Sequence, residues 1–245
     1  MAGNYGRVTS LALDPVEKKP LARFHPGTTV LSVGSYGCTM DCPFCQNAEI
    51  AQAGPDDVRW IEMSPEQLVN KALVIPRWSK CIGIAYTYNE PLAGWRYVRD
   101  TARLAHEKGL LNVLVSNGVA SADVIGEVAP HIDAANIDLK CFTEEGYRQL
   151  GGNLEAVKRT IETLASLQSC HVEVTTLVVP GLVDAAQVDE MSAWLASLDP
   201  LIPYHLTRFF PRHRMADARP TSVELINELA SIARTHLDDV MLGNV

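Results

Sequence analysis

The chain has 245 residues, of which 47% are hydrophobic and 20% are charged, and its formal net charge is −8. This composition is typical of a globular protein with a sizeable core, and the negative charge argues against a generally basic surface for nucleic acid or anionic membranes. The sequence contains no apolar run of about 18 residues and no apolar signal segment. We therefore expect a cytoplasmic protein with reduced cysteines and with neither a membrane nor a nucleic acid as partner.

Residues 1–28 contain three prolines and several turn-forming residues, and they are expected to form an irregular lead-in to a single domain over 29–245. In that domain, short runs of β-branched and apolar residues alternate with amphipathic helical patterns. The predicted strands cover 29–35, 82–88, 111–115, 134–139, 172–179, 204–210 and a short 240–242. Capping boxes are predicted before two of the helices, at Ser64 with Gln67 and at Thr221 with Glu224.

Six main strands separated by helices predict an α/β fold with a parallel sheet. Right-handed crossovers would curl such a sheet into a partial (β/α)6 barrel of the TIM-like kind. In barrels of this kind, the reactive groups lie at the carboxyl ends of the strands. Polar residues at the predicted strand ends are therefore candidates for a reactive site.

Three of the six cysteines, Cys38, Cys42 and Cys45, share one short loop after the first predicted strand, with the spacing C-x3-C-x2-C. Three thiolates are one fewer than the four that usually hold a [4Fe-4S] cluster, so one iron would stay open for another ligand. The alternative is a structural zinc loop, but such sites usually have four Cys or His ligands, and no second cysteine pair is present. The other three cysteines are scattered and are expected to be small buried side chains.

Polar residues follow several of the predicted strands and are candidates for one shared site. They are Asn89, Glu90, Ser116, Asn117, Asp138, Lys140, His205 and Arg208. Each has a simpler structural interpretation, which the sequence leaves open. Glu90 would cap the next helix, Asn117 would belong to a plain turn, and His205 would be a satisfied core group. Asp138 and Lys140 would be an ion pair at the barrel rim.

The cysteine loop with Phe44 before its last cysteine resembles the radical S-adenosylmethionine (radical SAM) superfamily. The likeness is greatest to the AmmeMemoRadiSam group, which is related to pyruvate formate-lyase activating enzymes. The stretches that carry it are 5–8, 14–21, 37–47, 86–91, 136–140, 208–211 and 242–245.

The resemblance implies an enzyme that binds a [4Fe-4S] cluster through the three cysteines and S-adenosylmethionine (SAM) through Phe44 and the polar strand-end residues. It implies reductive cleavage of SAM to a 5′-deoxyadenosyl radical, which abstracts hydrogen from an unidentified substrate. The alternatives are an activase that installs a glycyl radical on a partner enzyme and a non-catalytic metal-binding module. The implied partners are a low-potential electron donor such as flavodoxin or ferredoxin, with Memo-like or AMMECR-like proteins or a glycyl-radical enzyme.

Overall fold

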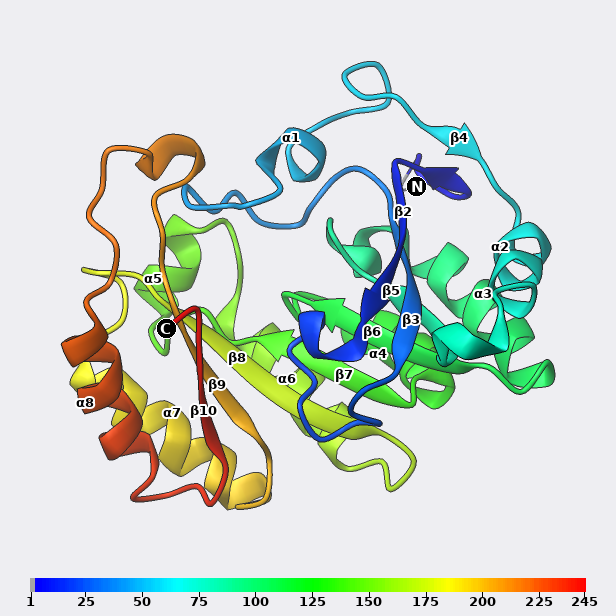
Figure 1. The fold of residues 1–245 in the computed structure, drawn as a ribbon. Coiled ribbons are helices and arrows are strands. Elements are labelled where there is room, and N and C mark those ends of the chain that lie inside the picture. Colours follow the sequence, from blue (N-terminus) through cyan, green and yellow to red (C-terminus); the bar gives the residue numbers. More distant parts are fainter. Residues whose placement is uncertain (1–2) are drawn as a thin grey trace.

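A computed structural model of the chain describes residues 3–245. Its main feature is an eight-stranded sheet with the order β10-β9-β8-β7-β6-β5-β3-β2 (Figure 1). Every neighbouring pair in this sheet is parallel except β2 with β3. Because β10 and β2 are its two edges, the sheet is open, and the predicted partial barrel is confirmed.

The parallel strands agree with the predicted ones to within a few residues. They are β3 (Thr29–Gly34), β5 (Cys81–Tyr86), β6 (Leu111–Ser116), β7 (Ala134–Asp138), β8 (His171–Val178), β9 (Tyr204–Arg208) and β10 (Val240–Gly243). Two short strands, β1 (Arg7–Val8) and β4 (Ile61–Glu62), pair with each other outside the main sheet.

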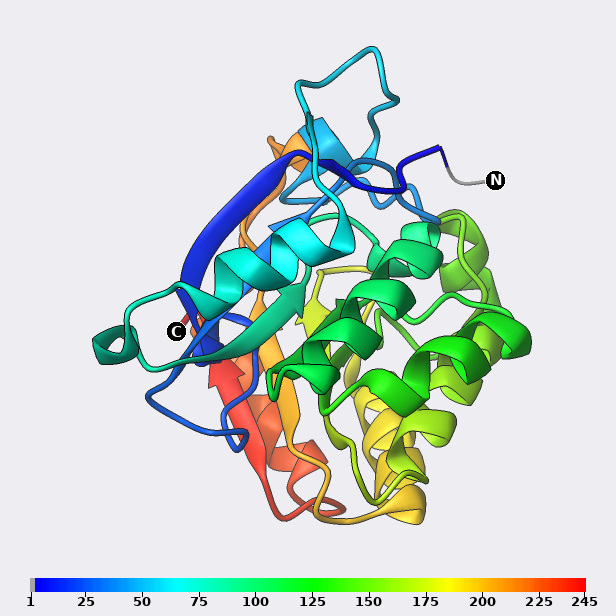
Figure 2. The same cartoon turned by 90° about the vertical axis from the view of Figure 1, so that its right-hand side faces the viewer.

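The helices lie mainly on the outer face of the sheet, and Figure 2 shows several of them as one layer. The α-helices are α1 (Ala48–Ala51), α2 (Pro65–Leu73), α3 (Trp95–Glu107), α4 (Ala122–Val128), α5 (Glu144–Gln149), α6 (Leu154–Ala165), α7 (Ala185–Leu198) and α8 (Val223–Ala233). The short 3-10 helices are η1 (Val16–Lys18), η2 (Arg77–Ser79), η3 (Pro91–Gly94), η4 (Ala129–His131) and η5 (His213–Met215).

One of the two predicted capping boxes is correct. The Ser64 side chain accepts from the Gln67 amide, and the Gln67 side chain accepts from the Ser64 amide. The second prediction is wrong, because α8 is capped by Ser222 and not by Thr221. The Thr221 hydroxyl instead donates to the Val178 carbonyl, so the residue fastens the helix entry to strand β8.

The expectation of an irregular lead-in is wrong for part of residues 3–28, and residues 1 and 2 lie outside the described part. Strand β2 (Ser10–Pro15) pairs antiparallel with β3 along its whole length. The unpaired edge of β3 offers backbone hydrogen bonds that a local reading of prolines cannot anticipate. Pro15 is tolerated because it is the last residue of an edge strand, where no ladder hydrogen bond from its nitrogen is needed.

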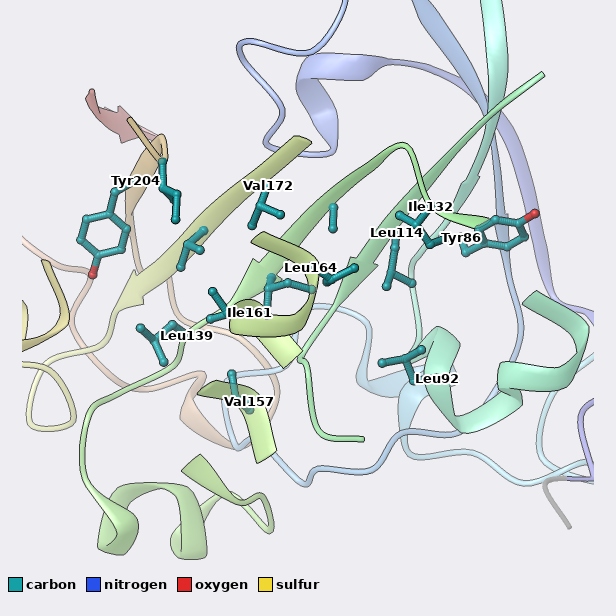
Figure 3. Close-up of a cluster of buried hydrophobic side chains, with 14 of the residues drawn as sticks. Tyr86, Leu92, Leu114, Ile132, Leu139, Val157, Ile161, Leu164, Val172 and Tyr204 are labelled. Atoms are coloured by element: carbon teal, nitrogen blue, oxygen red, sulfur yellow. The ribbon is translucent and has the colours of Figure 1, made fainter. Parts of the chain in front are cut away.

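Side chains alternate between two faces of the sheet, and each face has its own apolar cluster. The outer cluster lies between strands and helices, with Tyr86, Leu114 and Ile161 among its members (Figure 3). The inner cluster is smaller and joins Val16 and Leu21 of the N-terminal segment to strand residues such as Val113. Residues 16–24 therefore fill the inside of the open barrel.

The N-terminal segment also connects elements near both edges of the sheet. It continues directly from β2 at one edge, and the Arg23 guanidinium forms a bidentate ion pair with Asp239, the residue before β10 at the other edge. Between these points, the Ala22 and Arg23 amides donate to the Glu173 carboxylate on β8. The segment thus closes one end of the partial barrel.

Gly83 is required where β5 meets β6, and replacement by alanine is expected to destabilise the fold. A Cβ at this position would lie 1.8 Å from the Leu111 carbonyl oxygen, so the backbones would have to separate. We expect Gly83→Ala to lower the free energy of unfolding by about 3 kcal/mol, as overpacking of a rigid contact does. Urea unfolding followed by circular dichroism measures this loss.

Gly126→Ala is the matched control, because Gly126 is exposed on α4 and a Cβ there would meet nothing within 4 Å. The control should be neutral or raise stability by up to about 1 kcal/mol, the difference in helix propensity. Equal stability of the two variants would contradict the close approach of the strands.

Candidate active site

The cysteine loop follows β3 and is fixed to three other parts of the chain. The Asn47 side chain donates to the Tyr88 carbonyl (2.7 Å), and the Asp41 amide donates to the Leu150 carbonyl (2.8 Å). The Gln52 side chain donates to the Met40 carbonyl (3.0 Å). Hydrogen bonds within the chain therefore hold the loop at the carboxyl ends of the strands.

Cys38, Cys42 and Cys45 all carry free thiols on this loop, and Cys42 is 7% exposed. The Asn117 amide donates to the Cys38 sulfur at 3.5 Å, a contact that would stabilise a thiolate. Burial raises the pKa of the Cys42 thiol to about 11, while the nearby Lys140 ammonium lowers it. Metal binding by these thiols would therefore release protons.

The donor set fits an iron–sulfur cluster better than a single ion. Within residues 3–245, no three His, Cys, Asp or Glu side chains gather closely enough to hold one metal ion. A cluster does not require such crowding, because each thiolate binds a different iron at a separate corner. Phe44, between the second and third cysteines in sequence, is buried in the larger apolar cluster, and its contact with SAM stays a prediction.

Glu90 is the central buried carboxylate of this region, with 3% of its surface exposed. It caps η3 by accepting from the Leu92 amide (2.8 Å), and it also accepts from the Ser116 hydroxyl (2.7 Å) and the Asn117 amide (2.8 Å). Burial raises the pKa of Glu90 to about 7, although these hydrogen bonds act to lower it. The helix-cap interpretation is thus confirmed, and a role toward SAM stays a prediction.

Asn89 has a positioning role that is visible in the structure. Its side-chain oxygen accepts from the Ser35 amide (2.8 Å), and its nitrogen donates to the Tyr36 and Gly37 carbonyls. These bonds use the amide group of Asn89 to fix the start of the cysteine loop. Its predicted part in cofactor binding would therefore act through the loop.

Asp138 and Lys140 form the predicted ion pair at the end of β7, with Nζ and Oδ2 2.7 Å apart. Burial acts to lower the pKa of Lys140, but Asp138 and Cys42 outweigh it and raise the pKa above its usual value. Both side chains stay partly accessible, 34% for Asp138 and 16% for Lys140. Asp138 therefore holds the partly accessible Lys140 ammonium in a fixed position near Cys42 of the cysteine loop.

His205 does not lie at a strand end, and that placement was predicted wrongly. Strand β9 begins at Tyr204, so His205 is its second residue, and its Nε2 is 2.5 Å from Glu173 Oε2. Arg208 does end the strand, and its Nε donates to the Thr221 carbonyl (2.9 Å). Both residues already have partners within the chain, and their contacts with SAM stay predictions.

Glu173 is the residue that the sequence reading missed. It is completely buried on β8 and accepts from His171, from His205 and from the Ala22 and Arg23 amides. The available signal was a charged residue between two valines of a buried strand, which is costly unless it is paired. Burial acts to raise the pKa of Glu173, but its hydrogen bonds lower it from 4.5 to about 2.

Glu173→Gln is expected to lower the stability of the fold at neutral pH by about 1–3 kcal/mol, because the amide cannot accept all four bonds. A carboxyl with a lowered pKa stabilises the folded state above its unfolded pKa of 4.5, and the contribution is lost as pH falls toward about 2. The stability difference between wild type and variant should therefore shrink over that window.

Urea unfolding at several pH values measures this difference, and His171→Asn is the control. His171 is 31% exposed and bonds to the same carboxylate, so its loss should cost less. A difference that stays constant from pH 7 to the acid limit would contradict the assignment of an ionised, hydrogen-bonded Glu173.

Comparison with known proteins agrees with the geometry of the cysteine loop. The chain is 36% identical over 249 residues to an uncharacterised protein of Methanocaldococcus jannaschii, covering 100% of this chain and 72% of that protein. It is 25% identical to a second protein of that organism, provisionally named a glycyl-radical enzyme activating enzyme, covering 86% of this chain and 87% of that protein.

Solved structures show the same fold at low sequence identity. A domain of a pyruvate-formate lyase-activating enzyme from Bacteroides vulgatus matches with a TM-score of 0.55 and 19% identity, covering 66% of this chain and 99% of that chain. QueE from Escherichia coli matches with a TM-score of 0.60 and 13% identity, covering 98% and 93%.

A family profile described as the Radical SAM superfamily matches residues 32–193, which include the whole cysteine loop and the strand ends from β3 to β8. Enzymes of this superfamily use a [4Fe-4S] cluster and SAM, the two cofactors that the resemblance of the cysteine loop implied. Within residues 3–245, no helix is both long enough and apolar enough to cross a membrane. The matched region and its three cysteines establish that the chain belongs to the radical SAM superfamily, as an enzyme.

Proposed function

We propose that the chain cleaves SAM reductively at a [4Fe-4S] cluster held by Cys38, Cys42 and Cys45, and that the resulting radical abstracts hydrogen from a substrate. The observation that supports this most is the group of residues around the loop. Asn117 donates to the Cys38 sulfur, and the Lys140 ammonium lies close enough to lower the pKa of Cys42. When bound, the cluster would pass on one electron from an external donor, and SAM would supply the carbon–sulfur bond that this electron breaks.

In this proposal, residues of the chain bind and orient the cofactors and shield them from water. Asn117 holds the Cys38 sulfur and accepts from the Thr39 hydroxyl (3.3 Å), so the loop cannot turn away from the strand ends. The ammonium of Lys140 is a cation of fixed position that suits a carboxylate such as that of an amino-acid ligand. Phe44 and the buried side of the loop exclude water.

Glu90 offers a carboxylate in the same region, because Glu90 and Lys140 both act on the pKa of Cys38. Its two oxygens accept from the Ser116 hydroxyl and the Asn117 backbone amide, and an ammonium group of a ligand would compete with these donors. Asp138 fixes Lys140, so a ligand with both an ammonium and a carboxylate would meet opposite charges on two sides. This arrangement supports SAM as the ligand, since its methionine part carries both groups.

A second candidate is an activase that places a glycyl radical on a partner enzyme. Two relatives from Methanocaldococcus jannaschii bear provisional names of this kind. Residues 25–29 lack the arginine that activases often have before the cluster loop. The AmmeMemoRadiSam resemblance instead favours a partner of the Memo-like or AMMECR-like kind. A glycyl-radical signal in electron paramagnetic resonance, with a candidate partner present, would select the activase.

Replacing any one of Cys38, Cys42 and Cys45 by alanine is expected to abolish the cluster, because no described side chain stands ready to replace the lost thiolate. Anaerobic reconstitution of the unchanged chain should give about four irons and four sulfides, the composition of a cubane. Iron and sulfide analysis, together with the sulfur-to-iron charge-transfer absorbance, measures the cluster content of each variant.

Cys141→Ala is the matched control, because Cys141 is completely buried under α5 and lies outside the loop. It should keep the cluster. A full cluster in the triple loop variant, or its loss in the control alone, would refute the assignment of the three ligands.

Lys140→Met is expected to keep the fold and the cluster but lose most SAM cleavage. Methionine preserves the apolar stem while removing the ammonium, and a charged hydrogen bond contributes about 1.5–3 kcal/mol, equivalent to at least about tenfold in SAM affinity. Release of 5′-deoxyadenosine with dithionite as reductant and SAM binding by calorimetry are the two measurements.

Lys71→Met, on the exposed outer side of α2, serves as the control and should leave both quantities unchanged. If Lys140→Met binds SAM as tightly as the unchanged chain, the cation is a structural partner of Asp138 and has no ligand of its own.

A further inference from the structure

The loop between β9 and α8 is a basic, exposed segment in an otherwise acidic chain. Residues 208–219 contain four arginines and one histidine against one aspartate, whereas the whole chain has a net charge of −8. The side chains of Arg212, Arg214 and Arg219 are exposed. Such a local excess of positive charge attracts acidic surfaces from a distance.

This loop has a defined position because it is fixed at its base and near its tip. At the base, Arg208 Nε donates to the Thr221 carbonyl, and the Thr221 hydroxyl donates to the Val178 carbonyl. Near the tip, the Arg214 guanidinium donates to the Asp41 carbonyl oxygen and to its Oδ1, both at 2.7 Å. Figure 1 shows the loop in orange beside the cysteine loop and α1.

The surface of the loop also has an aromatic component. The Phe210 ring is 43% exposed, and the Arg208 guanidinium lies 4.9 Å from its centroid. Arginine and aromatic side chains are enriched in protein interfaces, where they contribute much of the binding energy. The exposed loop therefore combines a charge that attracts with an apolar group that binds.

The loop lies next to the cluster ligands and not on a remote face. Asp41, which Arg214 holds, is the residue directly before Cys42. The contact itself is open to solvent, since the Asp41 and Arg214 side chains are 57% and 49% exposed. A protein that docks over this contact would come within a few residues of the thiolates, and electrons tunnel efficiently only over short distances.

We propose that residues 208–219, called here the basic loop, form the docking surface for an acidic electron-transfer protein that reduces the cluster. The inference rests on the proposed function, because reductive SAM cleavage requires one electron from outside the chain. The donor is oxidised by one electron, the cluster accepts it, and no bond forms between the two proteins. The basic loop brings the donor to the Cys42 side of the cluster.

The double variant Arg212→Glu with Arg219→Glu tests this proposal, because it reverses two exposed charges and leaves the Arg214–Asp41 contact in place. The probe is an acidic flavodoxin, reduced in advance, mixed anaerobically with the reconstituted chain. The oxidation rate of the flavodoxin, its affinity by calorimetry, and 5′-deoxyadenosine release are measured at several salt concentrations. Dithionite, a small reductant that needs no docking surface, replaces flavodoxin in a parallel series.

We expect the variant to accept electrons from flavodoxin at least about tenfold more slowly at low salt, with weaker binding and a smaller salt dependence. With dithionite, 5′-deoxyadenosine release should equal that of the unchanged chain. Lys71→Glu with Arg77→Glu is the matched control, because it changes the net charge equally on the α2–η2 side of the molecule. The control should keep normal flavodoxin kinetics.

The outcomes separate this inference from the function on which it rests. Unchanged flavodoxin binding and electron transfer in the loop variant would overturn the docking surface while dithionite-driven cleavage leaves the proposed function intact. Equal losses with both reductants would also overturn it, because the loop would then serve the SAM or cluster site itself. Absence of SAM cleavage in the unchanged chain with dithionite would refute the proposed function first.

Discussion

The burial of Glu90 is the constraint on which the arrangement of the site depends. A carboxylate that is almost completely removed from water must be surrounded by donors, and here they come from two strand ends: the Leu92 amide after β5 and the Ser116 and Asn117 groups at the end of β6. The same Asn117 then reaches the cysteine loop through Cys38. One buried charge thus connects three segments that are far apart in sequence.

A second buried carboxylate organises the opposite end of the barrel. Glu173 collects two histidines of neighbouring strands and two amides of the N-terminal segment, so that segment becomes part of the barrel interior. The arrangement explains why an open sheet keeps its shape without hydrogen bonds between its edges. It also turns His205 toward the interior, where its orientation is fixed by Glu173 and not by solvent.

The two ends of the barrel have different chemical tasks. The end with the cysteine loop retains partly accessible charges, Asp138 and Lys140, and a carboxyl that titrates near neutral pH. At the end with Glu173, the ionised carboxylate is completely buried and held by four hydrogen bonds within the chain. Beside the cysteine loop, the arginines of the basic loop carry positive charge, although the chain as a whole is acidic.

Local patterns in the sequence determined the α/β class, the positions of the parallel strands and the three cysteines. These features depend on residues that are close together in the chain, such as the apolar run of 111–115 or the spacing of Cys38, Cys42 and Cys45. The predicted grouping of Glu90, Asn117, Asp138 and Lys140 follows equally from one rule, because parallel strands end on the same side.

Other features were decided only by the tertiary structure, because they depend on contacts between residues far apart in the sequence. Strand β2 forms because β3 has a free edge, Thr221 loses its capping role to the Val178 carbonyl, and His205 is turned by Glu173. Arg214 reaches Asp41 across 173 positions of sequence. In each case a polar group finds its partner in a segment that no local pattern names. Where the group is buried, as at Thr221 and Glu173, its hydrogen bonds have to be made within the chain.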